Sequence, residues 1–404
     1  MAGNANIDGH GREVKIQVVT PWYPDRYSAY SGIFVKKQVD ALTSLGHDVD
    51  VEMPVIYPAP LGDVPDDVYQ AMDSLAQIDP SAVFASENGA VKVPAPVPSR
   101  SGDLGRAAAY EKSLARKRFW MPIESGITHA HLGIPTGLAL LRLGVERLVV
   151  TEHQSTLDRV FGQPGATDAY EEVVANSSAF ICVSEHLKKQ IASKIEPTVA
   201  ESIEIVPNIV DLADIPFRVR KGGPLNHWLY IGTIASHKGV ELLLKAFKAY
   251  RETDRSAVLT IVGEGPQRPW VERFAAGSGL SGSLRLVGSV AHQAVGHYLA
   301  DAGVFVHLSP AETFGIATIE AIGAGLPVVS LRNGGAESAW GEFETSAGRL
   351  LPQDADADDV VDAIRYLEDH HSRLDPALGR RLVEERYSPS QVARSLVDIY
   401  ERIG

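Results

Sequence analysis

The sequence predicts an α/β protein built from two parallel-sheet domains of similar size. Short β-branched runs alternate with amphipathic helical patterns through most of the chain, as in parallel sheets wrapped by helices. A polar stretch with Gly and Pro, at 207–226, interrupts this alternation and is expected to be an interdomain linker. The 404 residues also exceed what one hydrophobic core normally organises, which again indicates two domains.

The N-terminal domain is expected to cover 13–206. Residues 1–12 lack the apolar core of a signal peptide and are expected to form a disordered tail. Residues 56–120 hold many prolines and little periodicity, which predicts an irregular insertion. Its basic residues suit either a solvated helix or an element that binds an acceptor or touches a membrane. The expected strands of this domain are 14–20, 48–53, 127–131, 147–151 and 179–184, and the expected helices are 33–46, 135–143, 167–176 and 185–194.

The C-terminal domain is expected to cover 227–387, followed by a helix at 388–404 that begins after a Ser-Pro break. A glycine and a proline near residue 326 stop one helix and are followed by a buried strand. The expected strands of this domain are 227–231, 257–263, 284–287, 303–308 and 326–331.

Composition excludes several classes of protein. The 51 acidic and 38 basic residues give a net charge of -13, which argues against nucleic-acid binding and allows at most peripheral contact with an anionic membrane. No apolar run approaches the roughly 18 residues of a membrane span. The single cysteine, Cys182, lies in an apolar run and is expected to be a buried strand residue. One cysteine permits no internal disulfide, which fits a cytoplasmic protein. The sequence leaves the oligomeric state open.

The segment 309–329, SPAETFGIATIEAIGAGLPVV, carries the strongest functional signal. It places Glu312 and Glu320 eight residues apart across a loop and a helix. Eight helical residues span roughly 12 Å, so the two carboxylates are expected to hold separate parts of one extended ligand. The backbone N–H groups of Gly315 and Ile316 open the helix, a position that favours a phosphate. Hydroxyls at one end, a diphosphate beside the helix start and a ribose further along describe a nucleotide sugar.

This segment resembles the signature of the retaining glycosyltransferases of family GT4. In the family pattern seven residues separate two glutamates and a Phe-Gly pair follows the first; Glu312, Glu320, Phe314 and Gly315 match it. The resemblance implies a GT-B fold, in which the parallel sheets of two Rossmann-like domains face a central cleft. It implies that Glu312 contacts donor-sugar hydroxyls and that Glu320 binds the ribose. The amides around Phe314, Gly315 and Ile316 would approach the sugar and the distal phosphate.

The segment LYIGTIASHKG resembles the family's diphosphate clamp, which reads Gly-Arg, four residues, Lys-Gly. Lys238 and the glycine after it match, but Thr233 stands at the Arg position. A charge-assisted phosphate contact of about 1.5–3 kcal/mol is therefore missing at this position. Substitution by His237 or by an arginine from elsewhere, a less charged donor, and weak or altered activity all remain open.

The resemblance extends to further positions. Gly32, before a helix, corresponds to the glycine loop that faces the donor diphosphate, and Gly263 to the nucleoside-side loop. His153, in VVTEHQST, corresponds to a histidine that lines the active site near the transferred sugar. His131 and Tyr23 are the candidates on the acceptor side.

The resemblance implies a retaining glycosyltransferase that moves a sugar from a nucleoside-diphosphate sugar to an acceptor hydroxyl. Glu312, His153 and Lys238 are the expected catalytic residues. The acceptor is a small molecule, a glycan or a lipid-linked sugar. No metal-ligand spacing or Asp-x-Asp pair occurs, so metal-independent catalysis without a cofactor is expected. The final helix is expected to return to the first domain. The alternative is a GT-B relative that couples or isomerises sugar nucleotides without forming a glycosidic bond.

Overall fold

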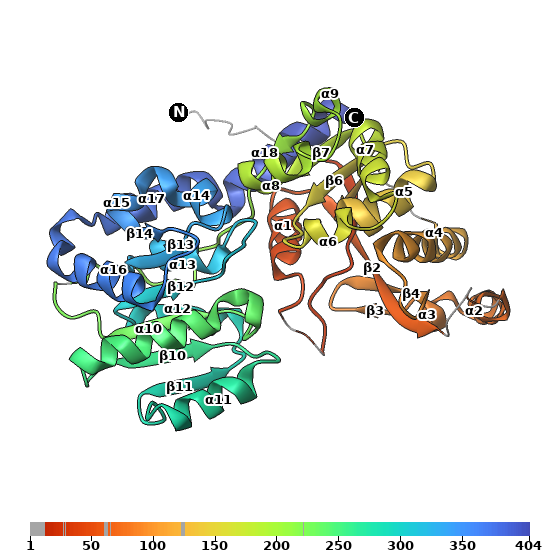
Figure 1. The fold of residues 1–404 in the computed structure, drawn as a ribbon. Helices are drawn as coiled ribbons and strands as arrows, with labels where there is room; N and C mark the ends of the chain where they lie inside the picture. Colours follow the sequence, from red (N-terminus) through yellow and green to blue (C-terminus); the bar gives the residue numbers. More distant parts are fainter. Residues whose placement is uncertain are drawn as a thin grey trace, which may run out of the picture.

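The computed structural model describes residues 13–26, 28, 30–59, 64, 66–122, 126–220 and 222–404, and the expected tail at 1–12 lies outside them. Two sheets organise the described chain, and the prediction of two parallel-sheet α/β domains is confirmed (Figure 1). The first sheet has the strand order β3-β4-β2-β1-β5-β6-β7-β8 and the second the order β11-β10-β9-β12-β13-β14. All described pairs are parallel except β3 with β4.

The first sheet is formed by β1 (Lys15–Val19), β2 (Asp48–Ala59), β3 (Ser86–Glu87), β4 (Ala90–Pro98), β5 (Ile127–His131), β6 (Leu148–Glu152), β7 (Ala179–Cys182) and β8 (Glu204–Ile205). Its helices are α1 (Ile33–Ser44), α2 (Asp66–Ile78), α3 (Pro80–Val83), α4 (Asp103–Trp120), α5 (Leu138–Arg142), α6 (Leu157–Phe161), α7 (Ala166–Asn176), α8 (Glu185–Ala192) and α9 (Pro197–Ala200). Strand alternation sends neighbouring residues to opposite faces. Leu148 and Val150 pack in the core that includes α5 and α7, whereas Val149 packs in the core with α1. Cys182 is a buried strand residue, as predicted.

The second sheet is formed by β9 (His227–Ile231), β10 (Val258–Val262), β11 (Leu284–Gly288), β12 (Val304–His307), β13 (Val328–Leu331) and β14 (Gly348–Leu351). Its helices are α10 (Val240–Thr253), α11 (Arg268–Gly277), α12 (His292–Asp301), α13 (Ile316–Gly323), α14 (Gly335–Trp340), α15 (Glu344–Ala347), α16 (Ala357–Asp369) and α17 (Pro376–Tyr387). Phe247 of α10 and Ile364 of α16 cover one face, and Leu299 of α12 and Ile319 of α13 cover the other.

The prediction of an irregular insertion at 56–120 is wrong. Within the described part of this stretch, β2 continues to Ala59 and pairs in parallel with β4, while α2 and α4 are regular helices. The prolines of β4 recur at every second position, at 94, 96 and 98. The N–H of Lys92, which shares their orientation, points to the β3 edge and donates to the carbonyl of Ala85. The missing donors therefore fall on the outer edge of β4, where proline does not interrupt the pairing with β2.

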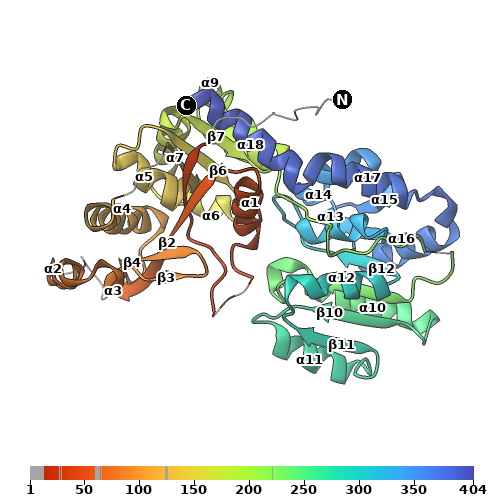
Figure 2. The same ribbon diagram turned by 180° about the vertical axis from the view of Figure 1, so that it is seen from behind.

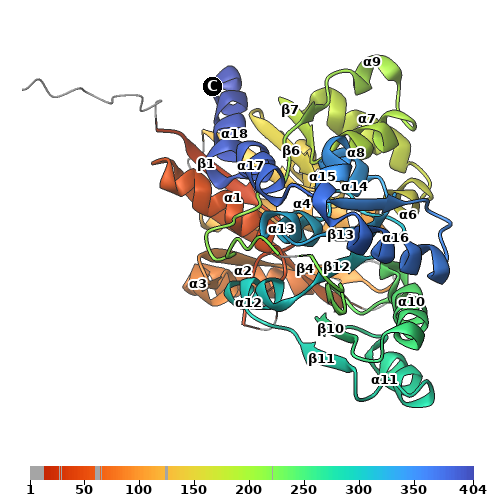
Figure 3. The ribbon, with the colours of Figure 1, turned by 90° about the vertical axis from the view of Figure 1, so that its left-hand side faces the viewer.

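The last helix, α18 (Pro389–Ile403), leaves the second domain and ends on the first (Figure 2). Its apolar residues Val392, Leu396 and Ile399 share a buried core with Val35 of α1 and Val18 of β1. Seen from the side, α1 and α13 lie in the region where the two domains meet (Figure 3). Among the described residues, no helix is both long and apolar enough to cross a membrane.

Candidate active site

Three adjoining cavities lie where the strand ends of the two sheets approach each other. The central cavity, of about 490 Å³, is lined from both domains by Gly32, His153 and Glu312 among others. The distal cavity, of about 330 Å³, is lined by Thr233, Gly263 and Glu320 among others, and shares Phe34 and Ile316 with the central one. The first-domain cavity, of about 340 Å³, shares Trp22, Ser31 and Gln154 with the central one. The shared residues place the three cavities side by side, in the order first-domain, central and distal.

Glu312 lies in the central cavity on the loop after β12. Its Oε1 accepts from Lys238 Nζ at 2.7 Å and lies 3.1 Å from His307 Nε2. Burial raises the pKa of this carboxyl, but the hydrogen bonds and charges of His307 and Lys238 outweigh burial and hold the pKa at about 2. Glu312 is therefore an anion throughout the neutral range and offers its free oxygen to a ligand hydroxyl.

Lys238 reaches this carboxylate from the turn between β9 and α10. Gly239 follows it at φ 70°, and a Cβ there would lie 1.8 Å from the carbonyl oxygen of Leu308. Only glycine permits this close approach and the positive φ. Thr233 lines the distal cavity, so the departure from the clamp pattern falls inside the site. His237 is exposed and lines none of the three cavities.

Two helices begin at the central cavity with the same backbone geometry. Gly32 precedes α1 at φ 65°, and Gly315 precedes α13 at φ 83°. Both glycines line the central cavity, one from each domain. The free N–H groups and the positive dipole ends of the two helices therefore converge on one space, which is favourable for an anion.

Glu320 lies one helical turn further along α13, in the distal cavity, and is 4% exposed. Its Oε1 lies 3.5 Å from both Lys37 Nζ of α1 and His292 Nε2 of α12. Burial raises the pKa of the Glu320 carboxyl, and Lys37 opposes this rise. A buried glutamate needs a partner, and here a lysine from the other domain supplies it.

His153 follows β6 and lines the central cavity beside Phe34, with ring centroids 4.6 Å apart. The buried carboxylate of Glu152 accepts from the backbone N–H groups of Gly133, His153 and Gln154, and also from the Tyr170 hydroxyl. These bonds fix the loop that carries His153. Glu152 is a positioning residue that sequence reasoning missed, because its partners come from three separate segments of the chain.

His131, a predicted candidate on the acceptor side, does not reach any of the three cavities. It is 1% exposed and lines none of the three cavities, because it lies behind His153, with its Nδ1 2.9 Å from His153 Nε2. Its ring also stacks on His129, whose Nδ1 lies 2.6 Å from the hydroxyl of Tyr400 in α18. The three histidines thus form a buried row from α18 to the central cavity.

The other predicted residues take varied places. Tyr23 lines the first-domain cavity, and burial raises its pKa to about 12. Phe314 lines the central cavity and packs edge-on against Tyr387. Gly263 lines the distal cavity where a Cβ would lie 1.9 Å from the carbonyl oxygen of Gly232. Among the described residues, no group of three or more His, Cys, Asp or Glu is placed to hold a metal ion.

Sequence reasoning missed Lys37 and His307. His307 ends β12 directly before the Glu312 loop, and a histidine at a strand's carboxyl end is the signal that could have identified it. Lys37 gives no local signal, because its partner Glu320 is 283 residues away.

The histidine row predicts a stability that falls in acid. Burial lowers the pKa of His129 and of His153 to about 3, and the pKa of His131 lies well below its ordinary value. Histidines of the unfolded chain, with a pKa near ~6.5, bind protons first as the pH falls. The row's contribution is therefore complete above pH ~6.5 and lost progressively below it, by up to about 1.4 kcal/mol per pH unit for each histidine. Urea unfolding at several pH values measures how steeply the free energy of unfolding falls with decreasing pH. His129→Gln should make this dependence less steep. An unchanged dependence would contradict the assignment of the acid sensitivity to the histidine row.

Comparison with known proteins identifies the family. The family described as Glycosyltransferase Family 4 matches residues 31–214, and the family described as Glycosyl transferases group 1 matches residues 213–381. The chain is 30% identical to a glycogen synthase of Mycobacterium tuberculosis over 288 residues, which cover 68% of this chain and 66% of the relative, just under two thirds of its length. It is 24% identical to the putative teichuronic acid biosynthesis glycosyltransferase TuaC of Bacillus subtilis, over 96% of this chain and 99% of the relative.

Solved structures share the fold. Sucrose-phosphate synthase from Thermosynechococcus elongatus superposes with a TM-score of 0.70 at 16% identity, over 96% of this chain and 99% of that chain. The Anabaena protein Alr3699/HepE, in complex with UDP and glucose, superposes with a TM-score of 0.64 at 13% identity. The superposition covers 96% of this chain and 100% of that chain. Two parallel-sheet domains, the matched glutamate pair and these likenesses agree. The chain belongs to the family 4 glycosyltransferases and has their GT-B fold.

Proposed function

We propose that this protein transfers a sugar from a nucleoside-diphosphate sugar to an acceptor hydroxyl with retention of configuration and without a metal ion. The observation that supports this most is the order of groups along the cavities. Glu312 and His153 line the central cavity, where the starts of α1 and α13 converge, and Glu320 lies in the distal cavity. A donor would place its sugar and diphosphate in the central cavity and its nucleoside in the distal cavity.

The chain's own groups suggest how transfer proceeds. The two helix starts and Lys238 would stabilise the charge that develops on the departing diphosphate, which is the main way such sites lower the barrier. The free oxygen of Glu312 would accept hydrogen bonds from donor-sugar hydroxyls and orient the ring. The acceptor would approach on the face from which the diphosphate leaves, and a phosphate oxygen would take its proton. Because Glu312 and Glu320 lie in different cavities, they do not form the carboxylate pair of a glycosidase.

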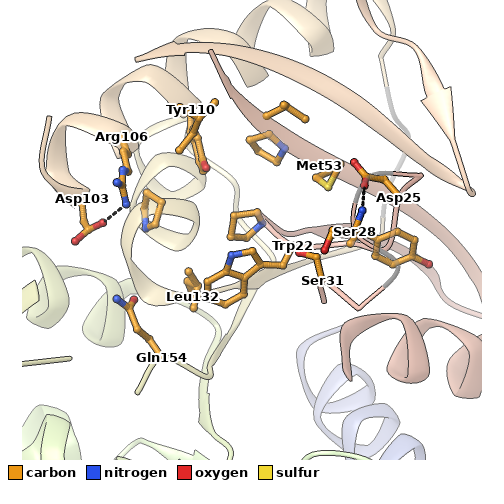
Figure 4. Close-up of a pocket in the computed structure, with 16 residues that line it drawn as sticks. Trp22, Asp25, Ser28, Ser31, Met53, Asp103, Arg106, Tyr110, Leu132 and Gln154 are labelled. Atoms are coloured by element: carbon orange, nitrogen blue, oxygen red, sulfur yellow. Dashed lines mark hydrogen bonds and ion pairs between the residues drawn. The ribbon is translucent and has the colours of Figure 1, made fainter. Parts of the chain in front are cut away.

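The first-domain cavity, whose lining residues are drawn in Figure 4, is the proposed acceptor site, because it shares Trp22, Ser31 and Gln154 with the central cavity. The charged side chains that line it are paired on the protein: Asp103 with Arg106 at 2.9 Å, and Asp25 with Lys92 at 3.0 Å. The Tyr110 hydroxyl points toward the cavity and has no hydrogen-bond partner among the described residues. A wall with compensated charges, a free hydroxyl and an indole suits an uncharged, hydroxyl-rich ring.

Tyr110→Phe is expected to raise the acceptor KM about two- to tenfold, because it removes one neutral hydrogen bond. The donor KM should stay unchanged. Tyr69→Phe is the matched control, since Tyr69 is equally buried in the same domain but lines none of the three cavities. Steady-state kinetics with each substrate varied in turn measures both values. Equal acceptor KM values for the two variants would remove the first-domain cavity as the acceptor site.

Transfer from a panel of nucleotide sugars to uncharged glycosides and cyclitols, in buffer with and without EDTA, tests the proposed function. Proton NMR of the product reads the anomeric configuration. Retention with no effect of EDTA is the expected result, and an inverted product or an EDTA-sensitive rate would contradict it. Because Thr233 stands in place of the clamp arginine, the alternative that the protein couples or isomerises sugar nucleotides is tested as well. A nucleotide sugar that is chemically altered while no glycoside forms would favour that alternative.

A further inference from the structure

The donor cavities offer little positive charge for a diphosphate. Among the described residues that line the central and distal cavities, Lys37 is the only lysine or arginine. Lys238 lies beside them, but its Nζ is already bonded to Glu312 at 2.7 Å. Thr233 occupies the position at which the clamp pattern carries a second cation. A diphosphate taken out of water needs compensating charge or donors, so Lys37 is the group to consider.

Lys37 and Glu320 occupy equivalent positions on two facing helices. Each residue comes five positions after the left-handed glycine that opens its helix, Gly32 for α1 and Gly315 for α13. The two side chains meet across the domain boundary, with Lys37 Nζ 3.5 Å from Glu320 Oε1 and 2.9 Å from His292 Nε2. The Lys37 side chain is 12% exposed. A ligand that lies between the two helices would therefore be close to this lysine.

We infer that Lys37 supplies, from the first domain, the cation for the donor diphosphate that position 233 lacks. The inference rests on the proposed function. When ribose hydroxyls donate to Glu320, this carboxylate no longer depends on Lys37 for hydrogen bonding. The ammonium group, on four flexible carbons, then turns toward the phosphate that adjoins the ribose. Because Lys37 belongs to α1 and Glu320 to α13, the nucleotide would be held by both domains at once.

Binding of nucleoside diphosphates by calorimetry tests this role. The probes are UDP, ADP, GDP, CDP and dTDP, and the variant is Lys37→Met. The matched control is Lys36→Met, which removes a neighbouring lysine whose Nζ pairs with Asp40 at 2.7 Å on the outside of the helix. The Kd of the preferred diphosphate is expected to rise about tenfold to a hundredfold in Lys37→Met and to stay near the wild-type value in Lys36→Met.

The same measurement in a Glu320→Gln background separates a phosphate contact from an indirect effect. If Lys37 touches the diphosphate, Lys37→Met should weaken binding by a similar factor in both backgrounds. A loss that disappears with Glu320→Gln would mean that Lys37 only holds Glu320, and this would overturn the inference. Equal Kd values for Lys37→Met and Lys36→Met would overturn it as well, while leaving the proposed function intact. Wild-type protein that binds none of the five diphosphates would overturn the proposed function itself.

Discussion

Glu312→Gln is expected to lower kcat by about a hundredfold to a thousandfold while the protein stays folded. The wild-type carboxyl has a pKa of about 2, so the substitution removes a permanent charge rather than a proton donor. It weakens the contacts to Lys238 and His307 that align the loop, and it leaves a sugar hydroxyl with a weaker acceptor. Lys238 can turn toward solvent, since its side chain is 19% exposed, so a large loss of stability is not expected.

The measurement is steady-state transfer with the preferred donor, and thermal unfolding checks that the variant is folded. Glu342→Gln is the control, because Glu342 is an exposed carboxylate of the same domain that pairs with Arg386 away from the three cavities. A variant that raises the donor KM but keeps kcat would show that Glu312 binds the ground state and transition state equally. That outcome would contradict its proposed part in the transfer step.

The proposed donor side of the site could be predicted from the sequence because it is local in the chain. Glu312, Gly315 and Glu320 lie within nine residues, where a loop, a left-handed glycine and a helix fix their relative places. The structure puts Glu312 in one cavity and Glu320 in the next, as their spacing implies. The two-domain fold was equally accessible, because strand and helix periodicities alternate on both sides of the linker.

The contacts that complete the site could not be predicted from the sequence, because they join residues that are far apart in the chain. Lys37 meets Glu320 across 283 positions, and His129 meets Tyr400 across 271. No periodicity or spacing reports such a pair. His131 illustrates the same limit: its place at a strand's carboxyl end was visible, but the depth that separates it from the cavity depends on how His153 packs in front of it.

The first-domain elements at 56–120 were misread for a different reason. The prolines of this stretch suggested irregular structure, yet those of β4, at 94, 96 and 98, occupy alternate positions whose missing N–H groups face the outer edge of the strand. The same stretch contains α4, which carries Asp103, Arg106 and Tyr110 to the first-domain cavity. The proposed acceptor site thus depends on a part of the fold that composition alone obscures.

Lys117→Met is expected to destabilise the first domain by about 3–5 kcal/mol, because it leaves a buried charge without its partner. Lys117 of α4 is 3% exposed, and its Nζ pairs with the carboxylate of Glu52 in β2, which is 1% exposed. The cost comes from the uncompensated carboxylate rather than from the lost attraction. The double substitution Lys117→Met/Glu52→Gln should therefore recover much of the stability, although it restores no ion pair.

Urea unfolding followed by circular dichroism measures all three proteins. A double variant as unstable as Lys117→Met would show that lysine packing, not charge, ties α4 to the sheet. Because α4 also carries Tyr110, the single variant should lose acceptor binding at a lower temperature than the wild-type protein and the double variant do. That order of loss would connect a buried ion pair at the end of α4 to the choice of acceptor at its beginning.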